Sequence, residues 1–292
     1  MPKGTSHEFW LSVLAGAKQA EAAYDGIEIT WKGPRSEGNL AEQIQIVESF
    51  IADGYDGICL APADAIALRK PVDQAIEAGI PVVIFDSGLE DLSGTISYVS
   101  TNNYRGGQSA GHHLATLLNG QGDVILMRYE LNSASTEARE QGFLDAIAEH
   151  EGINLLSADK YAGPDESGAI TLAEDLLSNH KDEVDGIFCP NQSTTSGTLT
   201  VLTRQFPELV GKVKLVGFDS GPNIADGIVS GEIQGTVLQD PVQMGYEAVK
   251  AMVDHLKGLP VEKTIETQEA LATPENKDDE VIHALLYPEQ AD

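Results

Sequence analysis

Two pairs of short motifs occur in the same order in both halves of the 292-residue chain. Asp56-Gly57-Ile58 begins a strand-like run, and about thirty residues later Phe85-Asp86-Ser87-Gly88 ends the next one. Asp185-Gly186-Ile187 and Phe218-Asp219-Ser220-Gly221 stand in the same relation. The agreement in order and in spacing predicts one structural unit that is used twice.

Helical and strand-like segments alternate along both halves. Apolar residues recur at helical spacing in the first segment, from Phe9 to Ala20. We expect helices near residues 8–24, 39–52, 65–78, 103–118, 136–148, 166–177 and 194–205, and strands near 27–31, 57–61, 81–85, 123–127, 153–158, 186–189 and 214–218. Strands separated by helices form parallel sheets, so the predicted fold class is α/β with two Rossmann-like lobes.

The chain is strongly acidic, with 18 basic and 46 acidic residues and a formal net charge of -28. Such a charge repels phosphate backbones and anionic membranes, which argues against a nucleic-acid partner. The apolar runs are shorter than the roughly 20 residues that cross a bilayer. The acidity is typical of a soluble protein and says little about a small ligand.

Cys59 and Cys189 lie in apolar strand-like runs, one in each half. Their spacing fits no metal or redox motif. We expect two buried, inert thiols in different lobes, with no disulfide between them and no metal or cofactor.

Asp86 and Asp219 stand at corresponding strand ends in the two halves. In open parallel sheets ligands bind beyond the carboxyl ends of the strands. Two facing lobes would aim both carboxylates into one cleft, where paired acceptors suit neighbouring sugar hydroxyls. Each Asp could equally cap the helix that follows it, and the spacing favours neither interpretation.

Further motifs stand in a characteristic order along nearly the whole chain: Lys3 to Trp10 with Gly16-Ala17, Val83 to Asp86, Thr101 to Gly107, Arg139 to Phe143, Pro190-Asn191, Val216 to Asp219, and Gln239 to Pro241 with Met244-Gly245. In this joint order the sequence resembles the ribose-binding branch of the periplasmic sugar-binding proteins. The resemblance implies two lobes joined by three hinge strands, with residues 1–101 plus 240–268 in one lobe and 102–239 plus 269–292 in the other.

The resemblance also implies which residues bind the ligand. Phe9 and Trp10 match aromatic residues that sandwich the sugar ring. Phe9 also fits the core-facing stripe of its helix, so Trp10 is the safer prediction. The remaining matches are polar residues and one aromatic residue that closes over the ring: Asp86, Thr101, Asn103, Asn191, Asp219, Gln239 and Tyr161. Asn103 could also cap its helix, and Phe218 belongs either beside the ligand or in the core.

Two departures bear on the identity of the ligand. Ser87 and Glu137 stand where ribose binders carry arginines. The cleft thus loses two guanidinium groups, which donate hydrogen bonds, and gains a carboxylate, which accepts them. Such an acceptor-rich cleft suits a polyol, another neutral sugar or even a cation better than ribose. His7 and Glu8 are further candidates, and Arg139 is either a ligand residue or half of a structural ion pair.

The beginning of the chain lacks two segments that the resemblance leads one to expect. Members of the family start with a buried strand ahead of the loop that matches Lys3 to Glu8, and Met1 begins inside that loop. No basic and apolar signal peptide is present either. We therefore expect upstream residues that encode a strand and an export signal, and a periplasmic or extracellular, possibly lipid-anchored, protein.

Catalysis has little support in the sequence. His112 and His113 are adjacent, without the spacing of a zinc helix, and the glycine-rich stretches match no phosphate-binding pattern. The predicted function is that of a monomeric solute-binding component, which takes a sugar or polyol to the membrane permease of an ABC importer. The alternatives are the ligand-sensing domain of a regulator or membrane receptor, and a sugar-processing enzyme of the same fold class.

Overall fold

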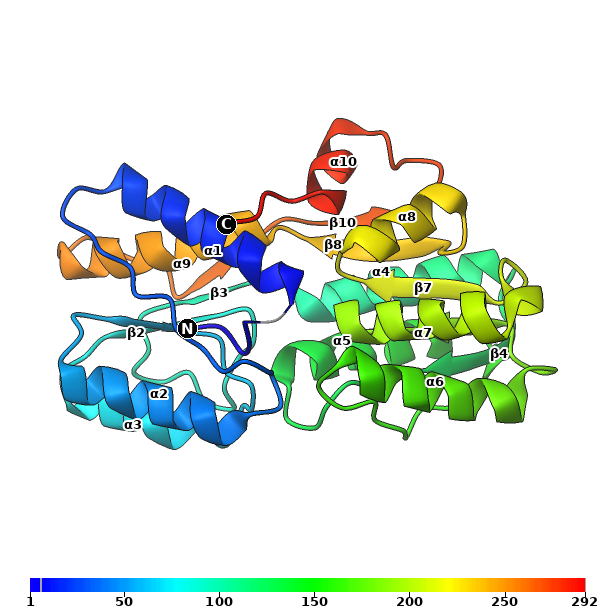
Figure 1. The fold of residues 1–292 in the computed structure, drawn as a ribbon, viewed down its shortest axis with the longest axis horizontal. Helices are drawn as coiled ribbons and strands as arrows, with labels where there is room; N and C mark the ends of the chain where they lie inside the picture. Colours follow the sequence, from blue (N-terminus) through cyan, green and yellow to red (C-terminus); the bar gives the residue numbers. More distant parts are fainter. Residues whose placement is uncertain (6, 292) are drawn as a thin grey trace.

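The computed structural model describes residues 1–5 and 7–291 and contains two parallel-stranded sheets that lie end to end (Figure 1). Each sheet carries helices on both faces, as the alternating pattern predicts. The first sheet has the order β1-β2-β3-β9 and the second the order β10-β8-β7-β6-β4-β5. We call the two halves the N-lobe and the C-lobe.

The strands are β1 (Ile58–Leu60), β2 (Val82–Phe85), β3 (Tyr98–Ser100), β4 (Gln121–Leu126), β5 (Gly152–Ser157), β6 (Gly186–Phe188), β7 (Lys214–Phe218), β8 (Gly235–Gln239), β9 (Thr264–Glu266) and β10 (Glu269–Ala272). All described pairings are parallel except that of β10 with β8. This antiparallel edge strand is the one departure from the all-parallel sheets that we predicted.

The α-helices are α1 (Glu8–Ala23), α2 (Leu40–Asp53), α3 (Arg69–Glu77), α4 (Asn103–Leu117), α5 (Ala134–Ala148), α6 (Glu166–His180), α7 (Gln192–Gln205), α8 (Pro222–Ser230), α9 (Pro241–Leu256) and α10 (Glu280–Leu286), and η1 (Pro207–Leu209) is a short 3₁₀ helix. No described helix is long and apolar enough to cross a membrane.

The alternating side chains of β2 build two cores in the N-lobe. Val82 and Ile84 face α2 and α3, whereas Val83 and Phe85 face α1 and α9. A strand that is buried on both faces has apolar residues at every position, and residues 82–85 have this pattern.

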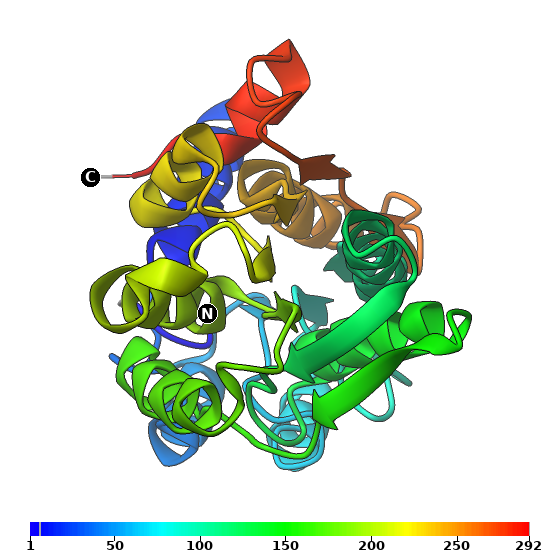
Figure 2. The same ribbon diagram turned by 90° about the vertical axis from the view of Figure 1, so that its right-hand side faces the viewer.

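The C-lobe repeats this layering. Leu126 and Phe188 pack against α4 and α5, while Ile125 and Ile187 face α6, α7 and α8. Figure 2 views the molecule from the C-lobe end, with helices on either side of its strands.

The chain passes between the sheets three times: from β3 to α4, from β8 to α9, and from β9 to β10. These passages lie at residues 101–102, 240 and 267–268.

The predicted strand at residues 27–31 does not form within the described part of the chain. The segment is extended but joins neither sheet, and a cavity lies between it and β1. Met1 is the one residue ahead of α1 that pairs with β1, donating to Cys59 O at 2.7 Å and accepting from Ala61 N at 3.0 Å. A strand needs a neighbouring strand to bond with, and residues 27–31 have none among the described residues; Ile29 N donates to the side chain of Glu21 instead.

The C-terminal segment touches both lobes. Ile282, Leu285 and Leu286 of α10 are buried in a core of the C-lobe, as expected for the tail. Beyond α10, Ala291 N donates to Leu11 O of α1 at 3.1 Å. The tail therefore runs across the junction between the lobes (Figure 1).

Candidate ligand-binding cleft

A small cavity lies between the lobes, where the carboxyl ends of their strands face each other. Its lining is mostly polar and consists of Lys3, His7, Phe9, Trp10, Glu37, Asp86, Tyr129, Ser135, Thr136, Arg139, Asn191, Gln192, Asp219 and Gln239. The cavity volume of about 30 Å³ accommodates a water molecule but not a sugar ring. The lobes are thus closed on each other, and a larger ligand requires them to part.

Asp86 and Asp219 occupy equivalent positions at the ends of β2 and β7. Both adopt the left-handed backbone conformation, with φ of 62° and 71°, which is uncommon outside glycine. The shared geometry shows that the repeated Phe-Asp-Ser-Gly motif is one turn used twice. Both side chains line the cleft.

The two carboxylates are held by different partners. Lys3 Nζ lies 3.3 Å from Asp86, whereas Asp219 accepts from Gln239 Nε2 at 2.6 Å and from Gln192 N at 2.9 Å. Asp219 thus caps α7, not the helix that follows it in sequence. Burial raises the pKa of Asp86, and the charges of Lys3 and Arg139 oppose this rise.

Trp10 and Glu37 form a network that spans the cleft. Trp10 is buried against Phe9 and Phe85, and its Nε1 donates to Glu37 Oε1 at 2.8 Å. The other oxygen of Glu37 accepts from Tyr129 of the C-lobe at 2.7 Å. Glu37 therefore fixes the indole ring and joins the lobes.

Arg139 extends from α5 beneath the cleft of the C-lobe. It donates to Asn103 Oδ1 at 2.8 Å and to Pro190 O at 3.0 Å, and its guanidinium lies 3.8 Å from the ring centroid of Phe218. Its distance to Asp219 is 3.7 Å. Arg139 is therefore both a structural residue and part of the cleft lining, and Phe218 is fully buried in the core.

A model of the periplasmic binding protein domain matches residues 1–260 of this chain. The chain belongs to the periplasmic binding protein family. It is 28% identical over 274 residues to the D-allose-binding periplasmic protein of Escherichia coli. The aligned region covers 90% of this chain and 86% of that protein.

Solved structures of other family members share the fold over nearly their whole length. A carbohydrate transporter solute-binding protein of Agrobacterium radiobacter in complex with D-arabinose is 32% identical, with a TM-score of 0.91, covering 98% of this chain and 96% of that one. A solute-binding protein of Agrobacterium vitis with bound D-fucose is 29% identical, with a TM-score of 0.93 and 98% of both chains covered.

The structure of this periplasmic binding protein brings most of the predicted residues into one place. His7, Phe9, Trp10, Asp86, Arg139, Asn191, Asp219 and Gln239 line the cleft. Thr101 and Asn103 lie behind it, with Thr101 donating to Gln239 at 2.7 Å and Asn103 accepting from Arg139. Asn191 also forms the capping box of α7.

Besides Thr101 and Asn103, four predicted residues lie outside the cleft lining: Glu8, Ser87, Glu137 and Tyr161. Glu137 is exposed and accepts from Asn132 N at 2.9 Å, and Tyr161 stacks beside Arg128. Ser87 is fully buried and accepts from Ser135 N at 3.1 Å. Local partners hold Glu137 and Tyr161 outside the lining of the closed cleft, and Ser87 joins the lobes. Their role in ligand binding stays a prediction.

The predictions missed six residues of the cleft lining: Lys3, Glu37, Tyr129, Ser135, Thr136 and Gln192. Lys3 lies in the same sequence motif as Trp10, and its closeness to Trp10 in the sequence could have indicated that it lines the cleft. Glu37 sits in a Gly/Pro-containing loop at residues 33–38, and Tyr129 follows β4. Polar residues on loops at strand ends often bind ligands, but the sequence does not specify their direction.

Proposed function

We propose that this periplasmic binding protein is the sugar-binding component of an ABC importer. It binds one monosaccharide or polyol between its lobes and does not alter it chemically. The observation that carries the proposal is the interlobe cleft in which Trp10 stands beside the paired carboxylates Asp86 and Asp219. It acts outside the cytoplasmic membrane as a monomer and docks on the permease in its closed form.

The chemistry of the cleft suits a sugar. An indole packs its face on the axial C–H groups of a ring, while Asp86, Asn191, Asp219 and Gln239 offer acceptors and amide donors to hydroxyls. Buried charge-assisted hydrogen bonds are about twice as strong as neutral ones, which favours a close fit.

The charges of the lining narrow the class of ligand. Glu37, Asp86 and Asp219 supply three acidic side chains, Lys3 and Arg139 supply two basic ones, and His7 lies 3.3 Å from Glu37. An uncompensated carboxylate repels sugar acids and sugar phosphates, so the ligand is a neutral sugar or polyol. Relatives in complex with D-arabinose, D-fucose, D-allose and myo-inositol support this class without selecting one member.

A thermal-shift screen against pentoses, hexoses, polyols and sugar acids tests the proposal. Saturation at 100 times the dissociation constant adds about 2.7 kcal/mol of stability, so a neutral sugar should raise the melting temperature. Trp10→Ala and Asp219→Ala should abolish the shift and still fold. Trp31→Ala is the matched control because Trp31 lies outside the cleft lining. Flat melting across the panel, or binding that both cleft variants retain, contradicts the proposal.

A further inference from the structure

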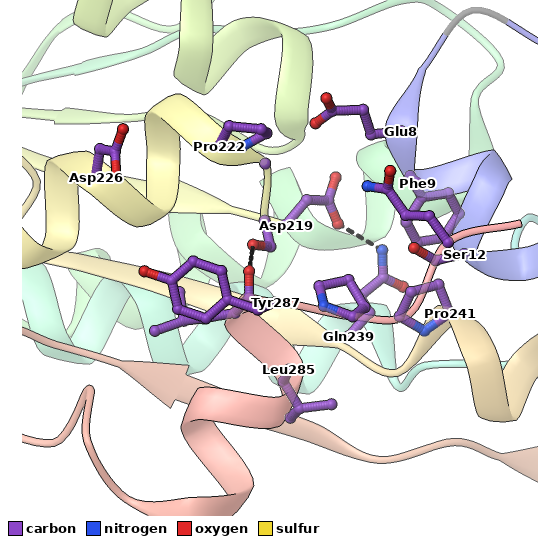
Figure 3. Close-up of a pocket in the computed structure, with 15 residues that line it drawn as sticks. Glu8, Phe9, Ser12, Asp219, Pro222, Asp226, Gln239, Pro241, Leu285 and Tyr287 are labelled. Atoms are coloured by element: carbon purple, nitrogen blue, oxygen red, sulfur yellow. Dashed lines mark hydrogen bonds between the residues drawn. The ribbon is translucent and has the colours of Figure 1, made fainter. Parts of the chain in front are cut away.

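A second cavity lies at the lobe junction, under the C-terminal segment. Its volume is about 260 Å³, and its walls come from the start of α1, the β7–α8 turn and residues 285–290 (Figure 3). It meets the sugar cleft only at Phe9, Asp219 and Gln239, where the hydrogen bond between Asp219 and Gln239 separates the two spaces. The two cavities are neighbouring but distinct.

Two buried acceptors in this cavity have no hydrogen-bond partner among the described residues: Glu8 Oε2 and Ser12 Oγ. Ser12 has 0% of its surface exposed, and both residues line the cavity. An unpaired buried polar atom is costly, which indicates that something else completes these groups.

The charge of the lining specifies what the missing partner must be. Glu8, Asp219 and Asp226 are acidic, and no described lining residue is a lysine, arginine or histidine. Asp219 already has partners, so Glu8 is the uncompensated carboxylate inside, and burial raises its pKa. A group that donates hydrogen bonds and carries positive charge would satisfy both Glu8 and Ser12.

Most of the remaining wall is apolar, although Ser220, Asp226, Gln239 and Gln290 also line it. Leu285 and Tyr287 of the C-terminal segment and Pro222 of α8 face Phe9 and Pro241. These surfaces suit a short hydrocarbon body but offer it no further charge. An occupant would contact α1 of the N-lobe and α8 of the C-lobe at the same time.

We propose that this cavity is a second binding site, which takes a small organic cation: a primary ammonium group on a short apolar body. The ammonium donates to Glu8 Oε2 and Ser12 Oγ, and the body lies against Leu285, Tyr287 and Pro222. The proposal does not rest on the proposed function, because Glu8 and Ser12 do not line the sugar cleft.

Saturation-transfer NMR with butylammonium chloride tests the site, with 1-butanol as the neutral probe. The full chain should saturate butylammonium and not butanol. Glu8→Gln should weaken the binding roughly tenfold or more, because it removes the charge-assisted bond. Ser12→Ala should weaken it several-fold without lowering the melting temperature, which a purely structural serine would not do.

Glu48→Gln is the matched control. It removes the same charge from an exposed position on α2, far in sequence from the cavity lining, and should leave the affinity unchanged. Equal binding by Glu8→Gln and Glu48→Gln would mean that the acidic surface attracts the cation non-specifically, and it would overturn the proposal. The absence of any signal from the unmodified protein would do the same.

Discussion

At the scale of single residues, the carboxylates of the closed cleft are held by partners within the protein. Asp219 is bonded to Gln239 and Gln192, and Glu37 is bonded to Trp10 and Tyr129. A sugar must therefore replace these hydrogen bonds with its own. Its affinity depends on the difference in free energy between the empty closed cleft and the cleft with the sugar bound. Removing one partner leaves the other unpaired, which makes such positions sensitive to substitution.

Glu140 predicts a specific pH dependence of stability. It is buried on α5, accepts from Tyr129 N at 3.1 Å and lies 3.5 Å from Arg128. Burial raises its pKa to about 7, although the Tyr129 bond and Arg128 oppose this. Between its ordinary pKa, near 4.5, and about 7 the folded state holds more protons than the unfolded state. Stability must then fall as the pH rises through this window.

Glu140→Gln should remove this dependence, because the amide oxygen still accepts from Tyr129 and does not titrate. Denaturant unfolding at about pH 5 and about pH 7.5 should show that the original protein loses up to about 3 kcal/mol relative to the variant. Parallel losses in the two proteins would show that Glu140 does not titrate in this range.

Sequence reasoning at this scale succeeded where a residue follows a strand end or a helix start. Asp86 and Asp219 line the cleft because the strand pattern fixes their positions, and Trp10, which the resemblance indicated, lines it from the start of α1. Glu37 was missed because it reaches the cleft from a loop, and a local bond to Asn132 holds Glu137 outside the lining. The spacing of residues along the sequence determines neither the path of a loop nor the rotamer of a side chain.

At the scale of elements, glycine brings the backbones of helix pairs into very close contact in both lobes. A Cβ added at Gly245 of α9 would lie 2.0 Å from Val13 O of α1, and one at Gly16 would lie 1.8 Å from Val242 O. In the C-lobe, Gly107 and Gly142 allow the same approach of α4 and α5. Backbone atoms cannot yield as side chains do, so these helix pairs tolerate no larger residue.

Gly245→Ala should destabilise the fold by about 2–4 kcal/mol, because α1 and α9 must move apart. Denaturant unfolding measures this loss. Gly88→Ala is the control: its added methyl would meet Tyr98 at an ordinary 3.7 Å, and its cost should stay within about 0.5 kcal/mol. Equal stability of the two variants would contradict the close contact.

Helix periodicity and buried apolar runs located α1 to α7 and the strands β1, β2 and β4 to β7, since those signals are local, whereas β3 and the elements after Phe218 were not predicted. The one predicted strand that does not form, at residues 27–31, has strand-like composition but no partner strand in the described structure. Strand formation depends on a distant neighbour, which composition does not supply. The antiparallel edge strand β10 was not expected for the same reason.

At the scale of the whole molecule, direct bonds across the cleft hold the lobes together. Ala65 N donates to Asn132 O at 2.9 Å, and Asn132 Nδ2 donates to Asp64 Oδ2 at 3.0 Å. Lys3 reaches Ser135 at 3.2 Å from the other side. These bonds exist only when the lobes are closed, so they contribute to affinity without touching the ligand.

Asn132→Asp should test this coupling. It places a second carboxylate opposite Asp64, and Asp tolerates the left-handed backbone at this position, where φ is 64°. The affinity for the sugar should fall roughly 3- to 10-fold by calorimetry. The double variant Asp64→Asn/Asn132→Asp should restore most of it. An unchanged affinity in the single variant would show that closure does not depend on this contact.

The binding of a sugar between the two lobes is tested by a crystal structure with the sugar that gives the largest thermal shift. We predict one ring in the interlobe cleft, packed on Trp10, with its hydroxyls bonded to Asp86 and Asp219 and both lobes in contact with it. Density for the sugar at any other place, or a cleft in which Asp86 and Asp219 keep their present partners while the sugar is bound, would contradict it.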